Sequence, residues 1–187
     1  MDIDGAGLLA EARRTVEMYL AHGKAPKQSP EFRSRYSAKS GVFVTITQDD
    51  SLRGCIGYPD PHQRLCEALS SAAIAAATRD PRFRPLTLDD LPKVSFEVTV
   101  LEPPRIVEES SPDDIIRDIM PGRDGLIVRG RGHSGLLLPQ VADEYGWSAE
   151  EFLKNVCRKA GLEPDAWRLP DVRIWKFGGT VFAENDS

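Results

Sequence analysis

The stretch Lys93-Val94-Ser95-Phe96-Glu97-Val98-Thr99-Val100-Leu101-Glu102 carries the clearest strand pattern in the chain. Its apolar residues alternate with serine, glutamate and threonine, which is the period expected when one face of a strand is buried. Earlier in the chain, the β-branched and aromatic run 42–47 predicts another strand. The turn residues 48–51 then lead into a returning strand over 52–58, so these segments predict a hairpin.

A helix is predicted between that hairpin and the alternating strand. Asp60-Pro61 is typical of a helix start, with Asp60 as N-cap and Pro61 in the first turn, and the apolar stripe runs to about Thr78. An earlier amphipathic pattern predicts an N-terminal helix over about 7–22, ended by Gly23.

The same order of elements recurs later in the chain, with a hairpin over 125–139, a helix over 149–160 and a strand over 172–177. We therefore expect an α+β fold of two β-β-α-β repeats, at about 41–102 and 125–178, that form one compact unit with a cleft between the repeats. With the N-terminal helix, residues 1–187 would make a single domain.

Composition and charge narrow the class of function. The 187 residues carry 24 Lys and Arg against 29 Asp and Glu, a net charge of −5. This balance argues against a globally basic nucleic-acid-binding protein. The segment Lys24–Ser40 is the exception, because five basic residues there face one acid, Glu31. It is interpreted as a solvated loop or, alternatively, as a local nucleic-acid contact.

Cysteine and histidine usage bears on compartment and metals. The cysteines Cys55, Cys66 and Cys157 have neither disulfide nor zinc-finger spacing, and the three histidines are isolated. The first residues do not resemble a signal peptide, and the alanine-rich run 68–78 is too short for a membrane span. We expect a cytoplasmic protein with no membrane segment, no metal and no cofactor.

The segment Leu52-Arg53-Gly54-Cys55-Ile56-Gly57 is unusual because two glycines lie within four positions of a strand. The predicted helix start just after it and the arginine guanidinium favour an anion. Three further arginines follow within 79–84. An equally good interpretation is that the glycines allow close packing and that the arginines pair with nearby acids at Asp80, Asp89, Asp90 or Glu97.

Cys55 adds an enzymatic hypothesis. A cysteine beside arginine and near a helix N-terminus can have a lowered pKa and act as a nucleophile, and His62 lies close enough in sequence to be its base. The alternative is that Cys55 is a core residue, as we expect for Cys66 and Cys157.

The segment Leu52-Arg53-Gly54-Cys55-Ile56-Gly57 resembles the signature hexapeptide of the AMMECR domain family. Further segments that match the family follow in order, and the resemblance covers about residues 7–184. They are 41–45, Asp80-Pro81-Arg82-Phe83 with Pro85-Leu86, Glu97 with its strand, 135–141 including Pro139-Gln140, and 159–162. The resemblance implies an internally duplicated α+β fold and a compact microbial form.

The resemblance also implies candidate site residues and partners. Beside Cys55 as the candidate catalytic residue, the ligand-binding candidates are Arg53, Gly54, Gly57, Asp80, Arg82, Phe83, Glu97, Pro139 and Gln140. Microbial relatives are associated with Memo-like and radical S-adenosylmethionine proteins. This chain lacks the three-cysteine cluster of a radical enzyme. We therefore expect a binding or accessory protein that takes an anionic ligand in a cleft lined by Arg53, Cys55, Arg82 and Glu97.

Overall fold

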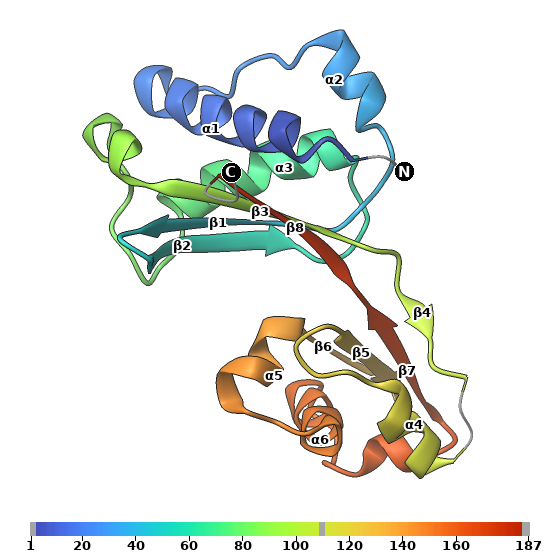
Figure 1. Cartoon of the computed structure of the whole chain (residues 1–187). Helices are drawn as coiled ribbons and strands as arrows, with labels where there is room; N and C mark the ends of the chain where they lie inside the picture. Colours follow the sequence, from blue (N-terminus) through green and yellow to red (C-terminus); the bar gives the residue numbers. More distant parts are fainter. Residues whose placement is uncertain (1–2, 109–110, 185–187) are drawn as a thin grey trace. The chain divides into compact units, whose positions relative to one another are not determined.

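The computed structural model describes residues 3–108 and 111–184. The chain forms two compact units, here called unit 1 (residues 1–101 and 180–187) and unit 2 (residues 102–179). Helices and antiparallel strand pairs occur in both, and a helix begins the chain (Figure 1). The fold class is therefore α+β with an N-terminal helix, as the sequence predicts.

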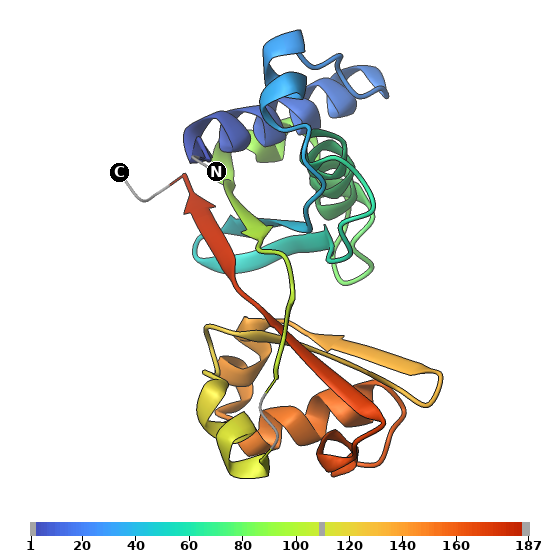
Figure 2. The same ribbon diagram turned by 90° about the vertical axis from the view of Figure 1, so that its right-hand side faces the viewer.

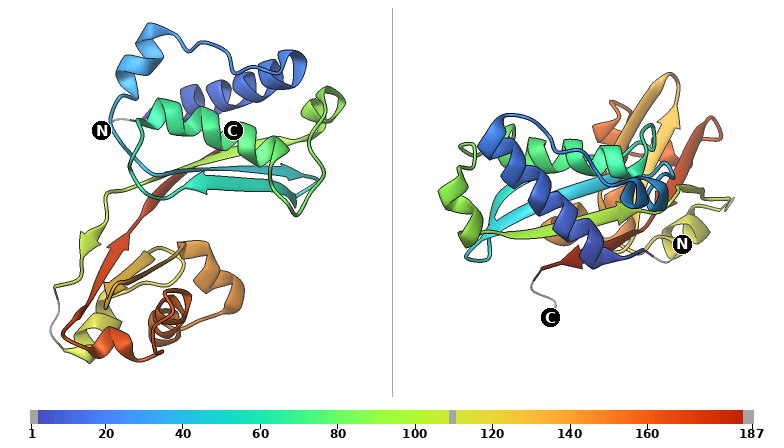
Figure 3. Two further views of the ribbon diagram at one scale, coloured as in Figure 1. Left: turned by 180° about the vertical axis from the view of Figure 1, so that it is seen from behind. Right: turned by 90° about the horizontal axis from the view of Figure 1, so that it is seen from above.

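Unit 1 is a four-stranded sheet covered on one face by two helices (Figures 1 and 3). Its elements are α1 (Gly5–His22), α2 (Pro30–Arg35), β1 (Val42–Gln48), β2 (Ser51–Tyr58), α3 (Leu65–Thr78), the 3-10 helix η1 (Leu88–Lys93), β3 (Ser95–Leu101) and β8 (Gly179–Ala183). The strand order is β2-β1-β3-β8, so β2 is an edge strand.

The local sequence explains most of these elements. Asp4 accepts a hydrogen bond from the Gly7 backbone N–H at 3.0 Å and begins α1, and Gly23 ends it in the left-handed region with φ 71°. Val42, Val44 and Ile46 alternate into the core of unit 1, where they meet the alanine-rich face of α3.

Unit 2 is a second four-stranded sheet, and α6 packs against two of its strands (Figure 2). Its elements are β4 (Arg105–Ile106), α4 (Pro112–Asp118), β5 (Gly125–Gly130), β6 (His133–Leu137), α5 (Pro139–Tyr145), α6 (Ala149–Lys159), the 3-10 helix η2 (Ala166–Arg168) and β7 (Val172–Phe177). Phe152, Leu153 and Trp167 are among its largest buried side chains.

The two sheets share one strand order. In unit 1, β1 lies between β2 and β3, and in unit 2, β5 lies between β6 and β7, with every one of these pairs antiparallel. The fourth strand of each sheet is reached directly from the third strand of the other unit, because the chain runs from β3 to β4 and from β7 to β8. Internal duplication and a single domain over 1–187 stay predictions.

Three segments differ from their predictions. The helix predicted from Asp60-Pro61 starts only at Leu65, because the chain first forms a bridge between Lys39 and Arg64, and the Leu65 N–H binds the Ala38 carbonyl oxygen at 2.8 Å. The predicted loop 24–40 contains α2, begun by Ser29 and Pro30. The predicted end of the second hairpin at Pro139 is instead the first residue of α5.

Candidate functional site

The hexapeptide Leu52–Gly57 lies on the edge strand β2 and is split between the two faces of the sheet. Cys55 is directly opposite Thr45, and Gly54 is opposite Ile46. The register shifts beyond Ile46, where Leu52 pairs with Thr47, so Arg53 is the extra residue of a bulge. A bulge bends the strand and re-aims its side chains, which removes Arg53 from the regular alternation.

The two glycines of the hexapeptide serve close packing. A Cβ atom on Gly54 would lie 2.2 Å from the Ala76 carbonyl oxygen, so a side chain there would push α3 off the sheet. A Cβ atom on Gly57 would lie 2.3 Å from the Phe43 ring. The packing interpretation therefore accounts for both glycines, while a direct role in ligand binding stays untested.

The Asp80 side chain binds the backbone of the edge strand β2 at Cys55. The Asp80 carboxylate is buried and accepts the Cys55 backbone N–H at 2.9 Å, and it also accepts the Arg82 N–H at 3.1 Å. Arg82 donates to the carboxylate through Nε at 3.0 Å and Nη2 at 2.7 Å, and Nη2 lies 3.4 Å from the Cys55 carbonyl oxygen. The pair thus occupies the hydrogen-bonding groups that an added strand would use.

These contacts hold the pKa of Asp80 well below its usual range, mainly because the Arg82 guanidinium donates to the carboxylate, with help from the two backbone N–H groups and against the effect of burial. Phe83 follows, and the Arg82 guanidinium lies 5.4 Å from the centre of its ring. The structure therefore joins the hexapeptide to the Asp80-Pro81-Arg82-Phe83 segment, while a shared binding site stays a prediction.

A second acid–arginine pair lies beside the first. Arg84 forms two hydrogen bonds of 2.9 Å to the buried Asp90 carboxylate, and the pKa of Asp90 is likewise held well below its usual range. Arg53 donates through Nη1 to the Arg84 carbonyl oxygen at 2.7 Å, while its Nη2 is buried without a hydrogen-bond partner among the described residues. Arg53 therefore binds the Arg84 backbone through an uncharged carbonyl oxygen and not through a carboxylate.

The Cys55 thiol lies on the sheet face opposite to that of Gly54. Its Sγ is 3.3 Å from the Thr45 hydroxyl oxygen, and Glu97 pairs with Thr45 from the neighbouring strand. The pKa of the Cys55 thiol is raised, mainly because the thiol is buried, with help from the Asp80 and Glu97 charges and against the Thr45 hydroxyl and Arg82. This direction is opposite to the one that a cysteine nucleophile needs. Thr45 lies in the matching segment 41–45, but it is not among the candidate site residues.

The remaining candidates are distributed differently. Pro139 and Gln140 open α5 in unit 2, where Pro139 is buried and Gln140 is exposed, so they belong to a separate unit from the hexapeptide. Cys66 and Cys157 are fully buried core residues, as predicted. Across residues 3–108 and 111–184, no three His, Cys, Asp or Glu side chains are grouped to hold a metal ion.

Comparison with known proteins identifies the family. The family model described as AMMECR1 matches residues 9–182. The chain belongs to the AMMECR1 family. A Methanothermobacter thermautotrophicus protein is 45% identical over 182 residues, covering 97% of this chain and 95% of the relative. Protein MJ0810 of Methanocaldococcus jannaschii is 44% identical over 184 residues, covering 97% and 90%.

A crystal structure supports the fold of this AMMECR1 family member. The uncharacterised protein PH0010 from Pyrococcus horikoshii matches with a TM-score of 0.82 and 44% identity, covering 97% of this chain and 91% of that one. The likeness shows family and fold and carries no activity over. In the described parts of this chain, no helix combines the length and apolar character that crossing a membrane requires.

Proposed function

We propose that this AMMECR1 family member is a binding or accessory protein whose hexapeptide segment recognises an anionic group of a ligand or partner. The observation that carries the proposal is the state of Arg53, whose guanidinium has one buried nitrogen, Nη2, without an acceptor among the described residues. A buried donor left unpaired costs about 1–3 kcal/mol. The Arg53 side chain as a whole is partly exposed, so a small shift of the guanidinium would let an oxygen of a bound carboxylate or phosphate supply the missing acceptor.

The charges around Arg53 favour the same ligand class. Arg82 is matched by Asp80 and Arg84 by Asp90, so those two arginines have carboxylate partners within the chain. Arg53 instead binds a backbone carbonyl oxygen and forms no ion pair with any described residue. Its charge therefore has no carboxylate partner among the described residues, and a ligand anion would neutralise it.

Cysteine catalysis is the weaker alternative. The raised pKa of Cys55 keeps the thiol protonated at neutral pH, and only the thiolate is an effective nucleophile.

Binding to nucleic acid through residues 24–39 is a weaker alternative still. Arg35 in that segment contacts Asp4 at 3.4 Å and lies 5.8 Å from the Tyr36 ring centre, which gives it a structural role. The overall charge of −5 also opposes a nucleic-acid partner.

The proposed setting is a cytoplasmic modification pathway shared with Memo-like and radical S-adenosylmethionine proteins. Its support is the family resemblance, since microbial relatives are associated with those two classes. In such a pathway this chain would hold a substrate or a partner segment while another protein performs the chemistry. Co-expression with a Memo-like protein and size-exclusion chromatography tests this setting, which predicts co-elution.

The anion site is tested by titrating inorganic phosphate and acetate into the protein and following backbone amide NMR shifts. We expect saturable shifts at Arg53–Gly57, and a loss of roughly tenfold or more in affinity in Arg53→Gln, since a hydrogen bond to a charged group contributes about 1.5–3 kcal/mol. Arg33→Gln on α2 is the matched control and should bind like the wild type.

Two results would contradict the anion proposal. One is the absence of saturable shifts in β2 with both anions. The other is equal binding by Arg53→Gln and the wild type, which would place the anion elsewhere. Unfolding curves of both variants establish that each remains folded.

A further inference from the structure

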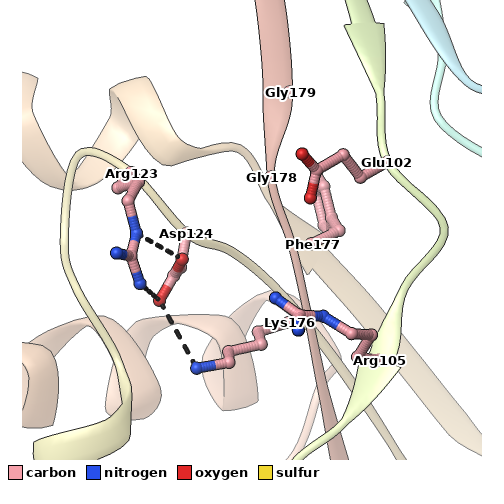
Figure 4. Close-up of a pocket in the computed structure, with 8 residues that line it drawn as sticks. All are labelled: Glu102, Arg105, Arg123, Asp124, Lys176, Phe177, Gly178 and Gly179. Carbon is pink, nitrogen blue, oxygen red and sulfur yellow. Dashed lines mark hydrogen bonds and ion pairs between the residues drawn. The ribbon is translucent and has the colours of Figure 1, made fainter. Parts of the chain in front are cut away.

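Unit 2 contains a polar pocket of about 280 Å³ that the sequence motifs do not point to (Figure 4). It lies where β4 and β7 meet the start of β5, and Arg105 pairs directly with Lys176 across that part of the sheet. Its charged lining residues are Glu102, Arg105, Arg123, Asp124 and Lys176. Its volume is near the lower end for ligand pockets, which fits a small polar molecule.

Glycine backbone leaves room on one side of this pocket. Gly178 and Gly179 line it, and the Gly178 carbonyl oxygen accepts the Glu102 backbone N–H at 2.9 Å. A Cβ atom on Gly178 would lie 3.0 Å from a carboxylate oxygen of Glu102, so the glycine allows that carboxylate to lie against the backbone (Figure 4). The backbone hydrogen bond to Gly178 and the space beside that glycine therefore both keep Glu102 at the pocket.

Two of the charged side chains are already committed to a fixed network. Lys176 donates to the carbonyl and carboxylate oxygens of Asp118, each at 2.7 Å, and its Nζ lies 3.9 Å from the Asp124 carboxylate. Asp124 is buried and accepts the Met120 N–H at 2.9 Å and the Arg123 Nε–H at 3.1 Å. Lys176 and Asp124 therefore shape the wall and leave little capacity for a ligand.

The side chains of Arg105 and Glu102 are different, because neither side chain forms a hydrogen bond or ion pair with any residue that the structure describes. Figure 4 shows the Glu102 carboxylate beside Gly178, and Arg105 is the strand partner of Lys176, so both charges line the same pocket; no ion pair joins them among the described residues. Glu102 also contributes, after Asp124 and Asp118, to raising the pKa of Arg123. The pocket therefore offers one cation and one anion that are both available.

From this arrangement we infer that the pocket binds a small zwitterion that carries a carboxylate and an ammonium group, as a free α-amino acid does. The carboxylate would bind the Arg105 guanidinium, with the exposed end of Arg123 beside it, and the ammonium group would bind Glu102. A simple anion would have to lie near Glu102, and a simple cation would lie near three basic side chains. This site is in unit 2 and does not depend on the proposed role of Arg53.

The experiment uses L-alanine as the probe, with acetate and methylammonium as its two halves, and follows the amide NMR signals of Gly178 and Gly179. L-Alanine should give saturable shifts at both glycines, and each half should bind roughly tenfold or more weakly. Arg105→Gln and Glu102→Gln should each weaken L-alanine binding to a similar degree. Arg158→Gln, an exposed arginine of α6 outside the pocket, is the control and should bind like the wild type.

Three outcomes would overturn the inference. If L-alanine causes no saturable shift at Gly178 and Gly179, the pocket does not bind this class of ligand. If acetate binds as well as L-alanine and Glu102→Gln has no effect, the pocket is an anion site. If Arg158→Gln weakens binding as much as Arg105→Gln, the effect reflects overall charge. Arg105 and Glu102 are exposed, so both variants should unfold like the wild type.

Discussion

The edge strands β2 and β6 occupy the same place in two sheets of the same strand order, yet they are secured differently. Each carries a glycine against its helix, since a Cβ atom on Gly54 would meet Ala76 and one on Gly135 would meet Ala160. In unit 1, Asp80 and Arg82 also bind the backbone of β2 at Cys55. Within the described residues, β6 has no such acid–arginine pair on its backbone.

The two edge strands share a glycine that allows close helix packing, but only β2 also has an acid–arginine pair on its backbone. The glycine that both units share is explained by the close approach of a helix to a strand, so Gly54 needs no ligand to account for it. Of the two edge strands, only β2 has arginines and acids of this kind around it within the described residues. They are therefore the better candidates for what this protein recognises, and the following variants test the distinction.

The largest effect is expected from Gly54→Ala. The added Cβ would lie 2.2 Å from a backbone oxygen, so strand and helix must separate, which costs about 3 kcal/mol of unfolding free energy. Gly135→Ala meets the Ala160 backbone N at 2.6 Å and should cost about 2 kcal/mol. Denaturant unfolding measures both, with Ser71→Ala on the exposed side of α3 as a control.

The same measurement tests the single-domain prediction. If residues 1–187 unfold as one domain, both glycine variants shift one common transition. Two transitions, each moved by one variant only, would show that the units unfold independently. A loss smaller than about 0.5 kcal/mol in Gly54→Ala would contradict the packing explanation of that glycine.

A smaller effect is expected from Asp80→Asn. The variant removes the negative charge that pairs with Arg82 and replaces one acceptor oxygen by a donor. The free energy of unfolding should fall by about 1–2 kcal/mol. The loss is moderate because the Arg82 side chain is over half exposed and solvent screens the pair. Asp165→Asn is the matched variant in unit 2, where the carboxylate is exposed and lies 3.7 Å from Arg168, and it should cost close to nothing. Equal losses in the two variants would contradict a special role for Asp80.

Low pH should lower the free energy of unfolding of unit 1, because the Asp80 and Asp90 carboxylates become protonated. The pKa values of Asp80 and Asp90 are lowered in the folded protein, so the unfolded chain binds more protons below its ordinary aspartate pKa of about 3.9. Their contribution to stability is therefore complete at neutral pH and is lost as the pH falls below about 4. The double variant Asp80→Asn/Asp90→Asn should lose less stability than the wild type over that range. Parallel pH curves would contradict the assignment.

The regular elements follow from local pattern, and the failures have physical causes. The strand 172–177 is found at the predicted residues, and the helix predicted at 149–160 ends one residue earlier, since periodicity and the Ser148 capping box act within a few residues. The start of α3 could not be predicted because it depends on Ala38 and Lys39, more than twenty residues away. The short helix α5 did have a local signal, Pro139 at its start and Gly146 at its end.

The structure brings together several of the residues that the sequence names as a candidate site, while their roles in binding or catalysis stay predictions. The joining of Cys55, Asp80 and Arg82 agrees with two segments that the family resemblance marks separately. Sequence reasoning left open whether the arginines bind a ligand or pair with acids, and the structure gives carboxylate partners to Arg82 and Arg84 but not to Arg53. The pocket of unit 2 had no motif, because Glu102 and Gly178 are brought together only by strand pairing.

The smallest effect is expected at Cys55. Cys55→Ala removes one half-buried sulfur atom and its contact with Thr45, and should cost less than about 1 kcal/mol. Because burial raises the pKa of the thiol, iodoacetamide should label Cys55 more slowly than a free thiol at neutral pH, with the buried Cys66 and Cys157 labelled only on unfolding. Faster labelling than the free thiol would revive the nucleophile hypothesis. Slow labelling together with full phosphate binding by Cys55→Ala would assign recognition at the hexapeptide to Arg53 rather than to the thiol.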